Sequence, residues 1–291
     1  MKKILSFLLF FILPITIFAK SKIIDAFLFY NEYEILEIRL NELYPYVDKF
    51  VIVEFTETFK GLPKDLNYPK IAPLLKKFSD KIVYYPCADR IATSDPWNRE
   101  FWQRSRLNVP LANLCNDEDI VMLSDVDEIP HHDTVVKMSE QISSGKEIFV
   151  SVYYNTYQFF LNRLANLTDC TIWTSWDYFK KHHAQTMREA RRYWGYPKTV
   201  EKGWHLTSMG GSDRVLQKMR DFSHSEDDIN EIANEPKGKP ITHETMNKIR
   251  RALPIVPIDD SFPEFIYKNI EYMDELGLID HDMTYIAPLP G

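Results

Sequence analysis

Glycine and cysteine are scarce in this chain, and it has no surplus of positive charge. Only 9 of its 291 residues are glycine, and neither GxGxxG nor GxxxxGK[ST] occurs. These absences argue against the glycine-rich phosphate loops of dinucleotide-binding and P-loop proteins. The formal net charge is -7, whereas nucleic-acid-binding proteins need excess Lys and Arg to neutralise phosphates. We therefore expect no nucleic acid among its partners.

The three cysteines, Cys87, Cys115 and Cys170, lack the close spacing of a metal-binding set. Their odd number allows at most one internal disulfide, and the sequence leaves open whether one forms. Hydrophobic residues make up 45% of the chain, which is enough for a full core. Neither an internal repeat nor a low-complexity linker interrupts it, so we expect one domain over residues 22–291.

The first 21 residues form a separate segment. Lys2 and Lys3 precede a largely apolar run that extends from Ile4 to Ala19 and contains Pro14. This order is typical of a secretory signal peptide, although an uncleaved signal anchor is the alternative. We expect the protein to be exported or membrane-anchored, in the Golgi or secretory lumen of a eukaryote or in the cell envelope of a bacterium.

Short apolar runs alternate with amphipathic segments from residue 23 onward. Asn31 is expected to cap the first helix, with Glu34 as the reciprocal partner. This alternation predicts an α/β fold with a Rossmann-like, mostly parallel sheet flanked by helices. The expected strands lie at 23–30, 50–53, 82–85 and 120–123, and the next helices pass through 74–78 and 98–108.

The second half is less regular. Residues 147–160 begin as a strand, and Ser212 is expected to cap a later helix. Aromatic residues gather in 171–204, where their rings suit stacking on sugars, although such clusters are more often core. The basic residues of 180–192 indicate a solvated helix face, with a site for an anionic acceptor as the alternative.

Three carboxylates crowd into the stretch LSDVDEIP, residues 123–130. Asp125, Asp127 and Glu128 directly follow an apolar strand, where like charges need compensation. A divalent cation such as Mg²⁺ or Mn²⁺ supplies it, because these ions prefer oxygen ligands. In parallel α/β sheets, ligands bind beyond the carboxyl ends of the strands. The alternative is a turn that binds nothing, with Glu128 capping the following helix.

Six longer segments carry a more specific pattern than the acidic motif alone. They are DAFLFYNEYEILEIRLNELYPYVDKFVIVE (25–54), TETFKGLPK (56–64), WNREFWQR (97–104), DIVMLSDVDEIP (119–130), KGWHLTSMGG (202–211) and FSHSE (222–226). Together they resemble glycosyltransferase family 17, which contains the animal enzyme that adds bisecting N-acetylglucosamine to protein N-linked glycans. The likeness covers roughly residues 23–230, in family order, and is far more specific than a DxD motif alone.

The resemblance implies a GT-A-like fold with an elaborated C-terminal half. It implies a nucleotide-binding part at about 22–130, an acceptor-side part at about 131–260 and a peripheral tail at 261–291. It also implies metal-dependent, inverting transfer of a sugar from a nucleotide sugar, with UDP-GlcNAc as the expected donor, in β linkage onto a glycan or glycoprotein acceptor.

Under this interpretation, Asp125 and Asp127 hold the metal ion and the diphosphate. His205 resembles a later family histidine and is expected as a further ligand, the alternative being a structural role. The residues expected to contact the nucleotide are Asn31, Glu54, Arg99, Gln103, Arg104 and Asp125. For the arginines the alternative is a solvated helix face, and for Asn31 it is capping alone.

Inversion requires a general base that deprotonates the acceptor hydroxyl. Glu226, Glu128 and Asp177 are the candidates, and the sequence does not choose among them. Two other classes stay open: a metal-dependent phosphoester hydrolase and a sugar-nucleotide or glycan-binding module without turnover. The hydrolase needs additional metal ligands, and no such set is evident in the sequence.

Overall fold

The computed structural model describes residues 20–191, 197–223 and 226–286. Eight strands form one sheet in the order β3-β2-β1-β4-β7-β6-β8-β5. The strands are β1 (Ile23–Leu28), β2 (Lys49–Phe55), β3 (Ile82–Cys87), β4 (Ile120–Leu123), β5 (Glu128–Pro130), β6 (Phe149–Gln158), β7 (Leu164–Ser175) and β8 (Lys198–Thr207).

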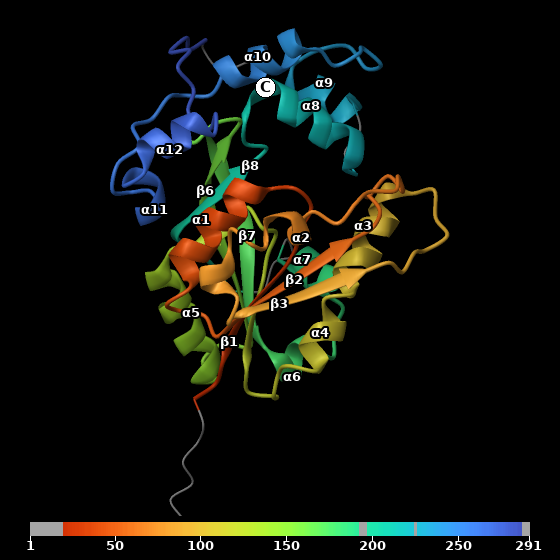
Figure 1. The fold of residues 1–291 in the computed structure, drawn as a ribbon, viewed down its shortest axis with the longest axis vertical. Coiled ribbons are helices and arrows are strands. Elements are labelled where there is room, and N and C mark those ends of the chain that lie inside the picture. The colour runs from red at the N-terminus through yellow and green to blue at the C-terminus, as the bar shows by residue number, and fades with distance from the viewer. Residues whose placement is uncertain (1–19, 192–196, 224–225, 287–291) are drawn as a thin grey trace, which may run out of the picture.

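Helices flank this sheet (Figure 1). Those of the first half are α1 (Tyr33–Leu43), α2 (Tyr68–Ile71), the 3-10 turn η1 (Lys76–Phe78), α3 (Pro96–Ser105), α4 (Asn108–Ala112) and α5 (His132–Ser143). Those of the second half are α6 (Trp176–Phe179), α7 (Ala184–Ala190), α8 (Gly211–Asp221), α9 (Glu226–Ile232), α10 (His243–Arg251), α11 (Glu264–Tyr267) and α12 (Ile270–Glu275).

Parallel pairing dominates the first half of the sheet. β1 pairs in parallel with β2 and β4, and β2 pairs in parallel with β3. In the second half β6 and β8 are parallel, whereas β4–β7, β6–β7 and β5–β8 are antiparallel. The predicted α/β class, with a largely parallel sheet between helices, is confirmed.

Alternating side chains along the strands pack into two apolar layers, as a strand with two buried faces requires. Phe27, Phe50 and Met122 pack with α1 and α5 on one face. Ala26 and Val121 pack with the helices of the other face, α4, α6 and α7. The sheet therefore lies inside the molecule, and only the ends of its strands are available for a binding site.

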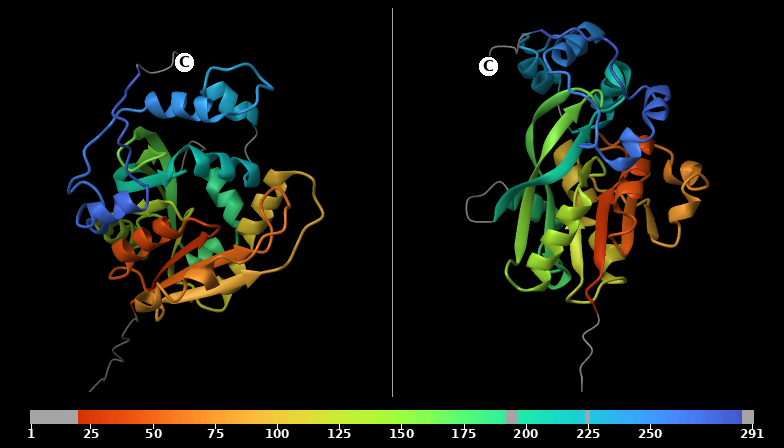
Figure 2. Two further views of the ribbon diagram at one scale, coloured as in Figure 1. Left: turned by 45° about the horizontal axis from the view of Figure 1, so that its top comes forward. Right: turned by 90° about the vertical axis from the view of Figure 1, so that its left-hand side faces the viewer.

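The helices α8, α9 and α10 lie at the end of the molecule opposite the start of β1, and α11 and α12 lie on the flank beside α1 (Figures 1 and 2). Residues beyond 260 contribute to a further core cluster, where Phe262, Ile266 and Met273 pack with Trp204 and Leu206 of β8. Polar contacts also hold this segment, since the buried Arg163 guanidinium donates through Nε to the Asp280 carboxylate at 2.7 Å. The segment 261–286 is thus part of the packed structure.

Several predicted boundaries were wrong. Helix α1 begins at Tyr33 with Glu32 at its cap position, and Asn31 makes no capping hydrogen bond. Helix α8 begins at Gly211 after Gly210, whose φ of 93° suits glycine, and Ser212 lies within the helix. The helix predicted through 74–78 is replaced by α2 and the turn η1.

Cys87, Cys115 and Cys170 are free thiols. Residues 1–19, which carry most of the predicted signal segment, lie outside the described residues. Among the residues that are described, none of the helices combines the length and apolar character that crossing a bilayer requires.

Candidate active site

A cavity of about 690 Å³ lies at the carboxyl ends of β1, β2 and β4. Its lining includes Phe29 after β1, Phe55 at the end of β2, and both Asp125 and Asp127 after β4. The cavity therefore occupies the position at which parallel α/β sheets bind ligands. The two aspartates of the acidic motif share it, as the sequence analysis required.

A buried arginine that the sequence analysis did not identify holds the acidic loop in place. Arg39 of α1 is fully buried and makes a two-pronged ion pair with Asp25 of β1, at 2.8 Å from Nε and 2.6 Å from Nη2. Its Nη1 also donates to the carbonyl oxygens of Asp125, Val126 and Glu128, at 3.2, 3.2 and 2.7 Å. Because Arg39 holds the loop through its backbone, the carboxylates remain available to the cavity.

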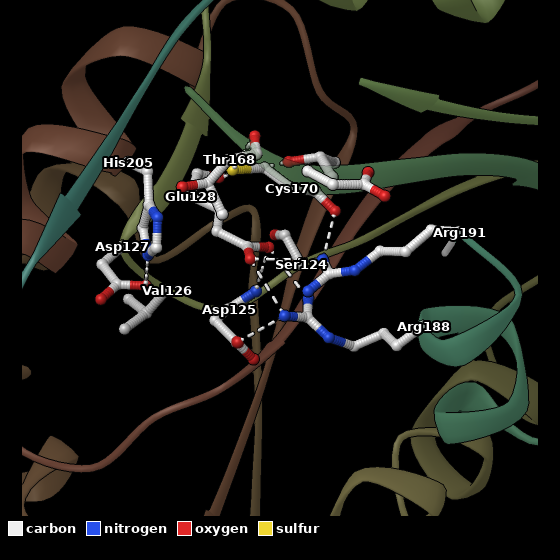
Figure 3. Close-up of polar contacts among 12 residues, drawn as sticks. Ser124, Asp125, Val126, Asp127, Glu128, Thr168, Cys170, Arg188, Arg191 and His205 are labelled. Atoms are coloured by element: carbon white, nitrogen blue, oxygen red, sulfur yellow. Dashed lines mark hydrogen bonds and ion pairs between the residues drawn. The ribbon is translucent and has the colours of Figure 1, made fainter. Parts of the chain in front are cut away.

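Asp125 lies between Arg104 and Arg188, and Figure 3 shows its contact with Arg188. Arg188 Nη2 donates to one carboxylate oxygen at 2.6 Å, and Arg104 Nη2 donates to the other at 3.3 Å. The Asp125 side chain is 37% exposed, while both arginines are buried. Asp125 is therefore the more accessible member of the aspartate pair.

Asp127 is buried and faces a histidine and a lysine. His205 Nε2 lies 3.6 Å from its Oδ1, and Lys218 Nζ of α8 lies 3.5 Å from its Oδ2. Burial opposes ionisation, but Lys218 and His205 outweigh it and hold the pKa of the Asp127 carboxyl below its usual range. The pKa of His205 is raised, because Asp127 offsets the effect of burial on the imidazole.

Glu128 is bound by the segment predicted to be a solvated basic face. Arg188 donates to its two carboxylate oxygens at 2.9 and 3.0 Å, and Arg191 Nη1 lies 3.5 Å from Oε1. Despite burial, these cations hold the pKa of Glu128 well below its usual range. The solvated-face prediction was wrong for Arg188 and Arg191, which point inward from the α7 region; Arg192 lies outside the described residues.

Glu32 and Lys218 also line the cavity, and the sequence analysis missed both. Glu32 accepts hydrogen bonds from the backbone N–H groups of Tyr30 and Asn31, and its carboxylate lies 3.8 Å from Lys218 Nζ. Burial raises the pKa of Glu32. The available signal was the position of Glu32 directly after the first strand, in the segment that resembles the family.

The predicted nucleotide contacts divide into two groups. Gln103 and Arg104 of α3 line the cavity. Asn31, Glu54 and Arg99 do not, and the Glu54 carboxylate is already bound by Lys64, Tyr84 and the backbone N–H groups of Asn67 and Tyr68.

Arg99 supports the segment that precedes the cavity. Its Nη1 donates to the carbonyl oxygen of Phe59 at 2.7 Å, and its Nη2 donates to the carbonyl oxygen of Thr93. Gln103 Nε2 donates to the carbonyl oxygen of Glu57 at 3.4 Å. Gln103 thus lines the cavity, and both Arg99 and Gln103 hold the backbone of the loop beside it.

Of the other two candidate bases, one lies outside the cavity and the side chain of the other is not described. Asp177 is absent from the cavity lining and pairs with Lys180 and Lys181 on the surface at 3.2 and 2.6 Å. Glu226 is the first residue of α9, but its side chain lies outside the described residues.

Most aromatic rings of the cavity come from the first half of the chain. They are Phe29, Tyr30, Phe55, Phe59, Trp97 and Phe101, joined by Phe222 from the second half. By contrast Trp173, Trp176 and Trp204 of the aromatic-rich segment are buried in the core. Tyr193 and Trp194 lie outside the described residues.

The cavity lining is acidic overall. Among the residues that the structure describes, it contains eight carboxylates against five Lys and Arg side chains. The carboxylates are Glu32, Glu57, Glu100, Asp125, Asp127, Glu128, Glu189 and Asp221, and the cations are Lys64, Arg104, Arg188, Arg191 and Lys218. An anionic ligand would meet net repulsion here unless it brought positive charge with it.

The family model named Glycosyltransferase family 17 matches residues 16–269. The chain belongs to this family. The resemblance read from the sequence is thereby confirmed over most of the chain. No curated protein matches it.

Three solved structures are distantly similar to this member of glycosyltransferase family 17. A mannosyltransferase from Pyrobaculum calidifontis, solved with GDP-Man and Mn²⁺, is 12% identical, with a TM-score of 0.42 over 66% of this chain and 56% of that one. A mycobacterial protein is 16% identical, with a TM-score of 0.31 over 47% of this chain and 42% of that one. TarS residues 1–349 of S. aureus are 11% identical, with a TM-score of 0.36 over 79% and 70%. The chain thus spans about half the length of the first two.

Proposed function

We propose that this protein is a metal-dependent, inverting glycosyltransferase. It transfers a sugar from a nucleotide sugar, with N-acetylglucosamine from UDP-GlcNAc as the expected donor, in β linkage onto a glycan or glycoprotein acceptor. Family membership supports the reaction class, and the donor and linkage follow from the earlier resemblance. The export or membrane anchoring predicted from residues 1–21 would place the reaction in a secretory lumen or a cell envelope.

The observation that carries this proposal is the position of Asp125 and Asp127 in one cavity, with cations held against them. Arg104 and Arg188 face Asp125, while Lys218 and His205 face Asp127. These cations can exchange partners when a diphosphate enters, because a phosphate oxygen replaces a carboxylate oxygen in each pair. The arginines would then hold the diphosphate through planar, two-pronged contacts.

The chemistry of these side chains suits a divalent cation. The carboxylate oxygens of Asp125 and Asp127 suit Mn²⁺ or Mg²⁺, and the acidic surplus of the lining favours an ion that accompanies the donor. Asp125 and Asp127 would hold the ion, with His205 adjacent to Asp127. When bound, it would offset the charge that develops on the leaving diphosphate.

The aromatic side chains of the cavity complement this polar end. Tyr30, Phe59 and Phe222 line the same space, and Phe222 makes edge contacts with both of the other rings at 5.9 and 5.3 Å between centroids. Such faces suit a nucleoside base or the apolar face of a sugar. They would orient the donor and exclude water around the anomeric carbon.

Donor turnover tests the proposal directly. The purified chain is incubated with a panel of nucleotide sugars and Mn²⁺, and release of the nucleoside diphosphate is measured. We expect turnover of UDP-GlcNAc that a chelator abolishes. Because it removes charge stabilisation of the leaving group, Asp127→Asn is expected to lower kcat by about 10²–10³-fold.

Asp177→Asn is the matched control, since Asp177 is an acidic surface residue outside the cavity lining. It should retain wild-type activity. Chelator-insensitive turnover, or full activity in Asp127→Asn, would rule out the metal-dependent mechanism. Release of phosphate from simple phosphoesters would favour the hydrolase, and donor binding without turnover on any acceptor would favour the binding module.

A further inference from the structure

A second cluster of ligand-type side chains lies outside the cavity. Glu42 is on the last turn of α1, His131 is the cap residue of α5, and His132 begins that helix. One ligand atom from each lies within 4.8 Å of the other two. Among the residues that the structure describes, this is the one group of three or more His, Cys, Asp or Glu side chains that meets this geometry.

The environment of Glu42 calls for a positive charge. Its side chain is only 5% exposed, and its Oε1 lies 3.0 Å from His132 Nδ1 and accepts from the His132 backbone N–H at 3.3 Å. In the described part of the chain, neither a lysine nor an arginine forms an ion pair with Glu42. A buried carboxylate needs a cation nearby, and the two imidazoles are the available groups.

The two imidazole rings lie close together, which disfavours a positive charge on both. Their ring centroids are 3.9 Å apart, a separation at which two imidazolium ions would repel each other. Two neutral imidazoles avoid that repulsion, and each has a ring nitrogen lone pair that can bind a metal ion.

A second carboxylate completes the surroundings. Asp133 places its two oxygens 3.4 Å from His131 Nδ1 and 3.5 Å from His132 Nε2, and Lys202 Nζ lies 3.7 Å from Asp133. Two carboxylates and one lysine leave this cluster with a net negative charge when the imidazoles are neutral. A divalent cation would remove that imbalance.

We propose that Glu42, His131 and His132 form a transition-metal site, with Zn²⁺ as the expected ion. Two imidazoles and a carboxylate are a common Zn²⁺ ligand set, and Asp133 or water would supply the fourth position. The Asp133 backbone N–H now donates to His131 Nδ1 at 3.1 Å. Metal binding through Nδ1 uses the lone pair that accepts this hydrogen bond, and binding through Nε2 leaves Nδ1 protonated. Either way, the capping hydrogen bond is lost when the metal binds.

The position of this site gives the ion a structural role. It would join the end of α1 to the start of α5, directly after β5, whose first residue, Glu128, lines the donor cavity. None of Glu42, His131 and His132 lines that cavity, so the proposal does not rest on the transferase function. Occupancy is expected to raise the thermal unfolding midpoint by several degrees.

Zinc binding to the full chain, purified without a polyhistidine tag, tests the proposal. Titration calorimetry with Zn²⁺ should give one site per chain, and bound Co²⁺ should give the absorption spectrum of a tetrahedral site. Glu42→Gln and His132→Gln should each weaken Zn²⁺ binding at least tenfold and abolish the thermal shift. Because His281 forms an exposed pair with Asp274 at 2.6 Å, His281→Gln serves as the matched control and should bind as wild type does.

X-ray absorption of the zinc-loaded wild-type chain provides a measurement that does not depend on whether any variant folds. Two imidazoles in the first coordination shell are expected. A shell without imidazole, unchanged affinity in both folded variants, or no binding by the wild-type chain would each overturn the proposal. Asp127→Asn should retain Zn²⁺ binding, which separates this site from the donor-binding aspartates.

Discussion

At the scale of single residues, Glu32 is a described carboxylate of the cavity lining whose surroundings favour accepting a proton. Glu128 is neutralised by two arginines, and Asp177 lies outside the cavity. Glu32 has a raised pKa, which brings it closer to the range in which a general base works best. We therefore expect Glu32→Gln to lower kcat for transfer by about 10²–10⁴-fold, with donor affinity changed much less.

Steady-state kinetics with separate donor and acceptor titrations would check this prediction. If Glu32 is the base, the wild-type rate falls as the pH drops through the raised pKa of Glu32. A protonated Glu32 carboxyl cannot take the proton of the acceptor hydroxyl. The Glu32→Gln variant should lose that acidic limb. Glu34→Gln, on the adjacent turn of α1, is the control; equal activity of the two variants would contradict the role of Glu32.

How much of the site was predictable follows from where its residues lie in the chain. Asp125, Asp127 and Arg104 belong to short segments in which neighbouring residues alone indicate a binding site. Lys218 and Arg188 reach the same cavity from elements 91 and 61 positions after Asp127. Nothing local to either sequence segment reveals a buried acidic partner, so Arg188 was predicted to lie on a solvated helix face and Lys218 was not singled out.

At the scale of elements, β8 needs a glycine where it packs between the Tyr154 ring and the backbone of β5. A Cβ atom at Gly203 would lie 2.5 Å from the Tyr154 ring and 2.9 Å from the carbonyl oxygen of Ile129. Tyr154 is fully buried and has no room to move away. Gly203→Ala should therefore lower the free energy of unfolding by about 1–3 kcal/mol.

The same substitution should weaken donor binding, because His205 lies two residues further along β8. Urea unfolding and donor titration would measure the two effects. Val200→Ala in the same strand is the control, since Val200 is 65% exposed and should change neither quantity appreciably. If Gly203→Ala were as stable as the wild-type protein, the prediction would be wrong, and β8 could move away from Tyr154 and β5 at little cost.

The elements were predicted best where one physical signal dominates. Ile120–Leu123 is a fully buried strand, and its apolar run marked both ends correctly. The start of α1 was misplaced because Asn31 has a capping side chain, yet Glu32 folds back to bind the preceding backbone N–H groups instead. β5 has three residues, and its pairing with β8 is set by tertiary structure that no short pattern contains.

At the scale of the whole molecule, the C-terminal segment is held by a buried charge cluster. Asp280 binds Arg163 and Arg250, and all three side chains are buried. Asp280→Ala would leave two buried guanidinium groups without their shared carboxylate. We expect it to lower the free energy of unfolding by about 3–5 kcal/mol, as measured by denaturant titration.

Asp274→Ala offers the comparison, because Asp274 pairs only with the exposed His281 among its described contacts. Its effect should stay below about 1 kcal/mol. Similar costs for the two substitutions would mean that the segment beyond residue 260 adds little to the stability of the sheet.

The pairing of β5 also constrains how the chain is made. β4 and β5 are separated by only four residues, yet β5 forms its ladder with residues 203–205, which are synthesised much later. During translation the outer strand after the acidic loop has no partner until β8 has left the ribosome. A message truncated upstream of that point would therefore yield an incomplete sheet with exposed edges, a substrate for chaperones and proteases instead of a shorter functional form.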